Sequence, residues 1–491
     1  MNQEPLSPPP PFKPGSPSNG SGLNVLLVIL AFLFSLFGLL LSALPLIGTL
    51  GCVLAMIGGG LALPVIFRSG HEKPATHAKW KKWLALVCVV LCVFSVALTI
   101  LWTKQLGRLP KPGSCPHVYS YNGGQYSLEA DAFSGSLFEG AENTDFVLME
   151  RLAASDGKYR IRVINERDEL DYIDMISLVT ADHDANVEVA PNQEGGIVAF
   201  TRTDSPLHCE NSRHGNVLRQ VAYADDLRYI GDPGHFSSHS ASEPLDVLTV
   251  RFRRPSENRA QLIFRGNNSP FAATAVAHYL AQMGPGLGPV LRHVQGTKPG
   301  AYRRHIGDEI RRLGLLVRVE VWDGVRWQFQ TEIQPIGPAI QRTIAVPINV
   351  PYQNDPFLEV RLSMTPLFWE IDQVQLANAN PAPYRVQLGR LTIAQDQRKR
   401  DVIALLGNVD RQRIVLNKGD SFDAYFDVPA AQNTKRTLLV KIRGYYEMEI
   451  GGKDWLNPLA LMRHRSGTSS LPRFALELAH RQPQFFADQS R

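Results

Sequence analysis

Five side chains that can bind metals lie in one loop-rich stretch of this 491-residue chain. They are His208, Cys209, His214, His235 and His239, residue types that bind zinc or copper. His235 and His239 have the i, i+4 spacing of two ligands on one helix face, but the Phe-Ser-Ser between them follows Pro-Gly and argues against a helix. The pattern favours a loop, and we predict no metal and no cofactor.

A second group of side chains offers the oxygen ligands that calcium prefers. The group consists of Asn165, Glu166, Asp168, Glu169, Asp171, Asp174, Asp182 and Asp184. Because the spacing and the glycine of a calcium loop are missing, a solvated turn and a strand edge are the favoured interpretation.

The motifs of common catalytic sites are absent from the sequence. It has no nucleophile elbow, phosphate loop, Cys-x-x-Cys pair, His-Glu-x-x-His or dinucleotide fingerprint. The glycine-rich run 284–288 follows a predicted helix rather than a strand, which is typical of a plain loop. We therefore predict a protein that is not an enzyme.

Cys115 and Cys209 are the two cysteines that lie beyond the apolar N-terminal region. They could form a disulfide in an oxidising compartment. Pairing requires a Cα separation that the sequence does not give, so a disulfide and two separate buried thiols both stay open.

The N-terminal region is strongly apolar, and no charged residue occurs from Asn24 to Phe67. This run is about twice the length that a helix needs to cross a bilayer. After a disordered Pro/Ser/Gly-rich tail at 1–22, we expect three transmembrane helices at 24–45, 48–67 and 83–102. The glycines suited to close helix packing are Gly48, Gly51, Gly58, Gly59 and Gly60.

The charges between the second and third expected spans predict the orientation. The loop at 68–82 carries Arg68, Lys73, Lys79, Lys81 and Lys82 against Glu72 alone, which favours a cytoplasmic loop. The N-terminus would share that side of a bacterial inner membrane, and the chain after Trp102 would be periplasmic. A net charge of +5 with interleaved signs does not suggest a nucleic-acid partner.

Beyond a linker at 104–114, apolar and polar residues alternate with the period of half-buried strands. We expect a mainly-β soluble region of sandwich-like units with a few helices. Its expected parts are a first β domain at 115–245, a second with helices at 246–385, a third β unit at 386–450 and a tail at 451–491. Helices are predicted at 271–282 and 302–313, and a central strand at 172–180.

A hairpin is predicted at 315–331. A three-residue loop, Trp322-Asp323-Gly324, would pair Val321 with Val325, Val319 with Trp327 and Val317 with Phe329. One face of the hairpin would then be wholly apolar and would need a second layer, which favours a sandwich.

The acidic stretch also carries a resemblance. Asn165-Glu166, Glu169, Tyr172-x-Asp174, Leu178 and Asp182-His183 resemble a motif of uncharacterised bacterial exported or membrane-anchored proteins, some of which carry tetratricopeptide repeats. Further similarity lies at Cys115-Pro116, Asn267-Asn268-Ser269-Pro270, 321–327 and Gly444-Tyr445-Tyr446. The resemblance implies an extracytoplasmic location and β architecture, and it implies no catalytic or cofactor-binding residue.

These features together indicate a membrane-anchored, extracytoplasmic protein that binds other protein subunits as an accessory subunit or scaffold of an envelope assembly. Its predicted partners are the lipid bilayer and other proteins. The alternative is a carbohydrate-binding or carbohydrate-processing envelope protein, with Trp322, Trp369 and Tyr445 as candidates for exposed aromatic residues.

Overall fold

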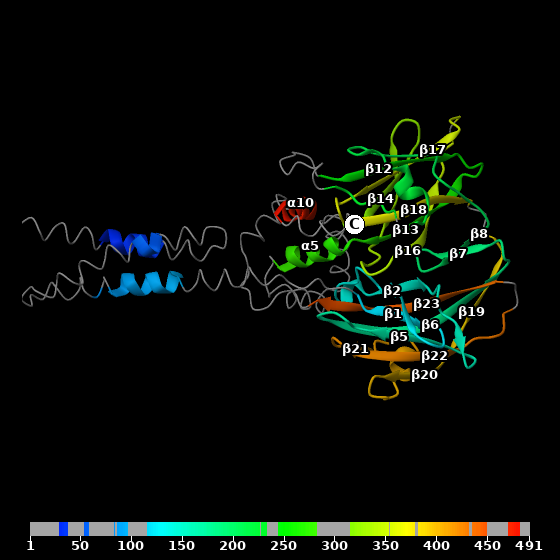
Figure 1. The fold of residues 1–491 in the computed structure, drawn as a ribbon, viewed down its shortest axis with the longest axis horizontal. Helices are drawn as coiled ribbons and strands as arrows, with labels where there is room; N and C mark the ends of the chain where they lie inside the picture. The colour runs from blue at the N-terminus through cyan, green and yellow to red at the C-terminus, as the bar shows by residue number, and fades with distance from the viewer. Residues whose placement is uncertain are drawn as a thin grey trace, which may run out of the picture. The chain divides into compact units, whose positions relative to one another are not determined.

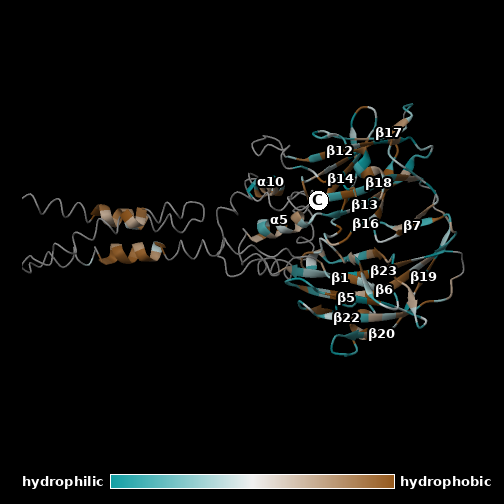
Figure 2. Ribbon diagram, in the orientation of Figure 1, coloured by the Kyte–Doolittle hydropathy of each residue, from teal (hydrophilic) through white to brown (hydrophobic). Residues whose placement is uncertain are grey.

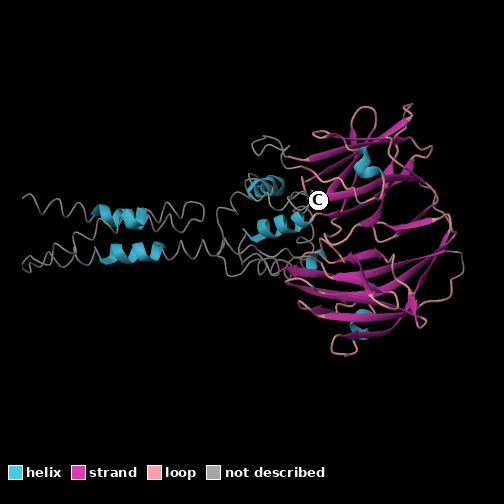
Figure 3. Ribbon diagram, viewed as in Figure 1, coloured by secondary structure: helices cyan, strands magenta, loops and turns pink. Residues whose placement is uncertain are grey.

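The computed structural model describes residues 29–37, 54–57, 83, 86–96, 115–225, 227–232, 244–281, 315–352, 354–378, 382–431, 435–448 and 470–481. The chain folds into two compact units, Met1–Leu109 and Pro110–Arg491. Strands dominate the described part of the second unit (Figure 3), which confirms the mainly-β prediction.

The described stretches of the first unit are helical at 29–37, 54–57 and 86–96. Their ribbons are almost entirely apolar (Figure 2). Within the described residues, no helix combines the length and the apolarity needed to cross a membrane. The expected spans extend well beyond these stretches, and Gly48, Gly51 and 58–60 lie outside the described residues, so the three-helix anchor stays a prediction.

The second unit contains two β-sandwiches, each with its own apolar core (Figure 1). In the first sandwich, sheet 1 has the strand order β2 (Tyr126–Asp131), β1 (His117–Tyr121), β5 (Lys158–Ile164), β22 (Ser421–Asp427) and β20 (Arg390–Asp396), with β4 (Ala154–Ser155) beside β5. Sheet 2 has the order β19 (Tyr384–Leu388), β6 (Glu169–His183), β23 (Lys435–Met448) and β3 (Asn143–Leu148), with β21 (Ile414–Leu416) beside β6.

The second sandwich is built from the chain between β6 and β19. Its sheet 3 has the order β16 (Arg342–Asn349), β13 (Arg259–Asn268), β18 (Trp369–Asn378) and β9 (Thr203–Asp204). Its sheet 4 has the order β11 (Gly215–Asn216), β10 (His208–Asn211), β12 (Asp246–Arg253), β17 (Phe357–Met364), β14 (Val317–Trp322) and β15 (Trp327–Ile333). A short hairpin of β7 (Glu188–Pro191) and β8 (Ile197–Phe200) lies between the two sets of strands in the sequence.

The sandwiches do not follow one another along the chain. Strands from the expected first and third β units, such as β6 and β23, pair in one sheet, and the second sandwich is an insertion between them. The boundaries expected at 115–245, 246–385 and 386–450 therefore differ from the pairing of the strands. Alternation of residues places a strand in a sheet but does not identify its partner, because a distant strand pairs as well as a near one.

Strand β6 occupies the interior of sheet 2, as predicted for the segment 172–180. Ile176 and Leu178 belong to the core between sheets 1 and 2. On the opposite face, Val179 packs with Phe146 and Ile197. Apolar residues on both faces therefore reflect two layers of cover.

The hairpin of β14 and β15 forms, but the predicted register is wrong. Trp322 pairs with Trp327 across a loop at 323–326, and a bulge between Val319 and Glu320 shifts the rest of the ladder. The Asp323 carboxylate accepts hydrogen bonds from the backbone N–H groups of Val325 and Arg326, at 2.8 Å each, which stabilises the longer loop.

In this register the side chains of β15 point to the opposite face of the sheet from the one predicted. Val317, Val319 and Val321 still face the core, but Trp327 and Phe329 lie on the outside of sheet 4. Strand β15 is the edge of the sheet, so it does not need a complete apolar face.

Helix α5 (Pro270–Ala281) confirms the helix predicted at 271–282, whereas the one predicted at 302–313 lies outside the described residues. The described part of the C-terminal tail is α10 (Leu471–Arg481), which contacts α5 (Figure 1). The rings of Tyr279 and Phe474 meet edge to face, with centroids 5.6 Å apart. The tail thus contributes to the core of the second sandwich.

Cys115 and Cys209 are free thiols. Cys115 lies in the core of the first sandwich and Cys209 in the core of the second. The disulfide that the sequence left open is therefore not formed, and both residues serve as small apolar core residues.

A buried arginine joins the two sandwiches. Arg342, at the start of β16, forms two hydrogen bonds to the Asp145 carboxylate of β3, at 2.7 and 2.8 Å. It also donates to the backbone carbonyl of Phe146 at 2.8 Å. Nearby, the Asp131 carboxylate accepts from the backbone N–H of Ala339 at 2.7 Å. Each of these charged groups would be costly to bury without its partner. The contacts among them therefore fix the position of one sandwich relative to the other.

Replacement of Arg342 should destabilise the second unit. Arg342→Ala leaves the Asp145 carboxylate without its partner, and we expect a loss of about 3–5 kcal/mol in the free energy of unfolding, measured by urea titration. Arg326→Ala, in the β14–β15 loop, removes a 77% exposed arginine and should change the stability by less than about 0.5 kcal/mol. Equal stability of the two variants would contradict a role for Arg342 in joining the sandwiches.

Candidate functional site

The acidic stretch forms β6 and the turn before it, and several of its side chains bind other parts of the first sandwich. Asn165 donates from its amide to the backbone carbonyls of Glu169 and Leu416, at 2.7 and 3.1 Å. Asp168 pairs with Lys418 at 2.8 Å. Asp182 is fully buried and binds Arg436 through both carboxylate oxygens. Asn165, Glu169, Asp171, Asp174 and Asp182 are buried, and β6 lies inside its sheet, so the expected solvated turn and strand edge is wrong for them. Glu166 and Asp184 are exposed, as expected.

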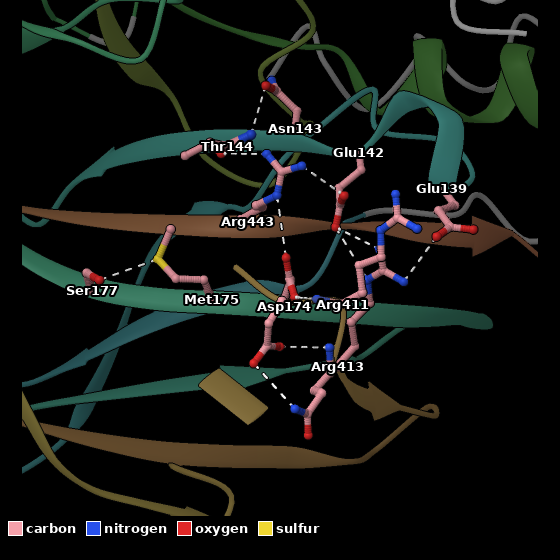
Figure 4. Close-up of polar contacts among 12 residues, drawn as sticks. Glu139, Glu142, Asn143, Thr144, Asp174, Met175, Ser177, Arg411, Arg413 and Arg443 are labelled. Atoms are coloured by element: carbon pink, nitrogen blue, oxygen red, sulfur yellow. Dashed lines mark hydrogen bonds and ion pairs between the residues drawn. The ribbon is translucent and has the colours of Figure 1, made fainter. Parts of the chain in front are cut away.

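Asp174 belongs to a network of alternating charges that links β6, β23 and the chain near β21 (Figure 4). Its carboxylate accepts the backbone N–H of Arg411 at 2.9 Å and lies 3.5 Å from the Arg443 guanidinium. Arg443 continues to Glu142 at 2.9 Å, and Glu142 is also bound by Arg413 at 3.3 Å. All the charged groups of the network are thus paired with one another.

Stacked aromatic rings extend this network. Tyr172 and Tyr445 are parallel, with centroids 4.5 Å apart, and the Arg413 guanidinium lies 5.2 Å from the Tyr445 ring centroid. Beside them, the ladder of β6 and β23 bulges at Gly444, where a Cβ atom would overlap the Tyr172 carbonyl oxygen. Residues 172–174 and 444–446 therefore help to join β6 to β23.

The most unusual polar group is a buried pair of carboxyls, Glu169 and Asp171. Both side chains are at most 3% exposed, and neither has a positively charged partner among the described residues. Burial first, and then the neighbouring Asp171 carboxyl, raise the pKa of Glu169 well above its usual value. Burial likewise raises the pKa of Asp171 well above its usual value. The pair is stable when it shares a proton.

Cys115 and His117 lie close to this acidic pair, a combination that in other settings supports nucleophilic catalysis. Burial, followed by the charges of Asp131 and Glu169, raises the pKa of Cys115 well above its usual value. The thiol is therefore held in its unreactive form. His117 is only 3% exposed and contacts Asp131 at 3.3 Å and Glu166 at 2.8 Å. His117 is thus held between two carboxylates, and Cys115 lies in the core of the first sandwich.

Three of the five candidate metal ligands, His208, Cys209 and His214, lie among the described residues, and they do not form a metal site there. His208 lies on the outside of sheet 4, whereas the next residue, Cys209, points into the core. His235 and His239 lie outside the described residues, as does the run 284–288. Among the residues that the structure does describe, no group of three or more His, Cys, Asp or Glu side chains could hold a metal ion.

The outer face of sheet 4 gathers arginines and aromatic rings from four strands. It consists of Arg251, Arg318, Glu320, Trp322, Trp327, Phe329, Phe357, Glu359 and Arg361, and is called the arginine–aromatic face below. The rings of Trp322 and Trp327 lie 5.4 Å apart. The Arg361 guanidinium covers Trp327 at 4.5 Å, and the Arg318 guanidinium covers Phe329 at 5.0 Å.

One carboxylate holds both of these arginines in place. Glu320 lies 2.6 Å from Arg361 and 3.1 Å from Arg318, and its side chain is 6% exposed. The guanidinium groups are thus positioned over the rings before any partner arrives. Phe329 nevertheless remains 50% exposed. A rigid arrangement of Arg and Trp side chains beside exposed apolar surface is the composition found at the centres of protein interfaces.

A groove of about 620 Å³ adjoins these residues. It is lined by residues of β10, β12 and β17, among them His208, Thr249, Arg251 and Phe357. Leu207 adds a half-exposed apolar side chain to its edge. The groove therefore extends the arginine–aromatic face across the sheet.

The three aromatic residues predicted to be exposed differ in their actual exposure. Trp369 is 1% exposed and lies in the core of the second sandwich, and Tyr445 is buried in its stack with Tyr172, so both predictions of exposure are wrong. Trp322 is partly exposed on the arginine–aromatic face. Trp327 and Phe329 were missed because the predicted register turned them inward. One sequence pattern could have revealed this outer face. It is the alternation of charged residues with buried valines and leucines on two strands, at Arg318, Glu320 and Arg361.

No protein-family model matches the chain, and a search of curated proteins finds no significant match. The resemblance of the acidic stretch to exported and membrane-anchored proteins therefore stays a prediction.

The buried carboxyl pair predicts how stability depends on pH. A folded-state pKa above the unfolded value of about 4 means that this pair takes up protons on folding, so its contribution to stability is greatest at low pH and falls as the pH rises above this value. Glu169→Gln removes one titrating group and keeps a hydrogen-bond donor for Asp171. We expect the variant to lose less stability than the wild type between pH 5 and pH 8, in urea titrations at each pH.

Glu194→Gln, at an exposed turn, is the matched control and should follow the wild-type curve. If Glu169→Gln follows the same curve too, the pair does not carry a proton in the folded protein.

Proposed function

We propose that this chain is a non-enzymatic, membrane-anchored protein of the bacterial envelope that binds another protein subunit through the arginine–aromatic face. The observation that carries the proposal is the set of partly exposed rings, covered by arginines that one buried glutamate fixes in position. Such a surface loses little side-chain freedom on binding, because its residues are already ordered.

The burial pattern of the first unit supports the anchor. Small residues are fully buried in its helical stretches, namely Ala31, Ser35, Ala55, Cys88 and Ser95. Large apolar residues are exposed on the same stretches, among them Leu33, Phe37, Val93 and Phe94, each more than half exposed. Small residues inside and large apolar residues outside are typical of helices packed in lipid.

The candidate reactive groups that the structure describes are engaged within the fold, which fits the proposed binding role. The Cys115 thiol is buried and protonated, the charged groups around Asp174 neutralise one another, and the acidic pair lies in the core. The arginine–aromatic face offers no nucleophile, and its charges are arranged for contact.

Photo-cross-linking in intact cells tests the proposed interface. With p-benzoylphenylalanine in place of Phe329, the full-length chain should give one discrete cross-linked product with a second protein. The same group in place of Val415, which is 44% exposed on β21, is the matched control and should give none. Trp327→Ala should reduce the Phe329 product at least about fivefold, because it removes the ring on which Arg361 rests.

Failure to cross-link from position 329, with normal expression, would contradict protein binding at this face. The paired rings of Trp322 and Trp327 lie on the same face as a groove with polar and apolar lining residues, which also suits a sugar ring and favours carbohydrate binding as the second candidate function. A glycan array separates the two, because binding that depends on Trp327 would support the second candidate.

The proposed orientation has its own test. Tyr352 is 96% exposed, whereas Cys115 and Cys209 are buried, so Tyr352→Cys introduces a reactive thiol over a low background. We expect a membrane-impermeant maleimide to label this variant once the outer membrane is opened, with the wild type as the control. Labelling that requires disruption of the inner membrane would place the second unit in the cytoplasm.

A further inference from the structure

A cavity of about 380 Å³ lies between the two sandwiches, away from sheet 4. The first sandwich contributes Glu129, Glu150 and Arg151, and the second contributes Arg228, Arg265 and Asn267. Its size falls within the range of small-molecule sites, and its lining is unusually rich in charged groups of both signs.

Asn267 points to a ligand because one of its atoms is unsatisfied. The residue is 3% exposed, and its Oδ1 atom has no hydrogen-bond partner among the described residues. Its Nδ2 atom donates to the backbone carbonyl of Asn268 at 2.9 Å. A buried acceptor without a donor is costly, so a group with an N–H or O–H that enters the cavity would gain by supplying one.

The polar side chains next to Asn267 in the sequence form hydrogen bonds within the fold. Asn268 accepts the backbone N–H groups of Ile336 and Gly337, at 2.8 and 3.1 Å. Ser269 caps α5 by accepting the N–H of Ala272 at 3.1 Å. Within the stretch 267–270, only Asn267 retains an unused side-chain polar atom, and Asn267 is one of the residues that line the cavity.

The charges of the lining select the class of ligand. Arg228 is paired with Glu370 at 3.1 Å, and Arg265 with Asp372 at 3.1 Å, so neither is available for a multiply charged anion. Arg151 is exposed, and its guanidinium forms no ion pair with a described residue; the guanidinium donates to the Leu128 carbonyl, and the backbone N–H donates to the Glu129 carboxylate. Glu150 is 54% exposed and lies 3.8 Å from Arg265. Glu129 is bound by Ser120 and by two backbone N–H groups. The Arg151 guanidinium and the Glu150 carboxylate, whose contact with Arg265 is long, are therefore the charges most open to a ligand.

We propose that this cavity binds a small zwitterion, an α-amino acid or a short peptide, with its carboxylate on Arg151 and its ammonium on Glu150 and the Oδ1 of Asn267. A neutral sugar would leave both charges without counterparts, and a dianion would meet the carboxylates of Glu150 and Glu370. The ligand would contact both sandwiches at once.

Isothermal titration of the full-length protein tests this proposal. The probes are L-alanine, L-glutamine and L-alanyl-L-alanine, with N-acetyl-L-alanine and L-alaninamide as analogues that lack the ammonium and the carboxylate, respectively. We expect at least one zwitterion to bind, and its capped analogues to bind at least about tenfold more weakly, because each lacks one charge-assisted contact.

Variants locate the site. Arg151→Gln, at an exposed position that should not affect folding, should weaken binding at least about tenfold, and Arg326→Gln should leave it unchanged. Asn267→Ala should weaken binding too, and circular dichroism checks that it folds. The proposal is overturned if no zwitterion binds, if the capped analogues bind equally well, or if Arg151→Gln has no effect. Because the cavity shares no residue with the arginine–aromatic face, neither result bears on the cross-linking test.

Discussion

The pairing of β6 with strands on both sides is the constraint on which the second unit depends. Its neighbours β19 and β23 both follow the second sandwich in the sequence, so residue pairs such as His183–Tyr384 enclose that whole sandwich. The first sandwich is complete only when both ends of the inserted chain return to one place. The Arg342–Asp145 contact then fixes the insertion against the sheet from which it emerges.

The polar residues of the two sandwiches serve different ends. In the first, two buried aspartates of β6 are matched with arginines of β23, Asp182 with Arg436 and Asp174 with Arg443, and these ion pairs join the two long strands. In the second, the matched charges lie on the surface, where Glu320 fixes two arginines over aromatic rings. A similar ion pair therefore supports the fold in one place and presents a surface in the other.

The sequence predicts strands and helices better than it predicts their partners. The apolar residues on both faces of 172–180 identify a central strand, and the apolar spacing at 271–282 identifies α5, because both patterns depend on local geometry. The hairpin register could not be predicted, since it depends on a bulge and on the Asp323 side chain. The arginine–aromatic face could not be predicted either, because a shift of one residue in the register exchanges the two faces of a strand.

The insertion has a consequence for biosynthesis. During synthesis β6 emerges long before the strands that will cover its edges, and its open edges and apolar faces must wait while the whole inserted sandwich is made. The inserted sandwich is contiguous apart from α10, which arrives last of all. The nascent chain therefore exposes an unpaired, aggregation-prone strand during much of its synthesis. We expect this protein to depend on a chaperone more strongly than a protein of the same length with two sequential domains.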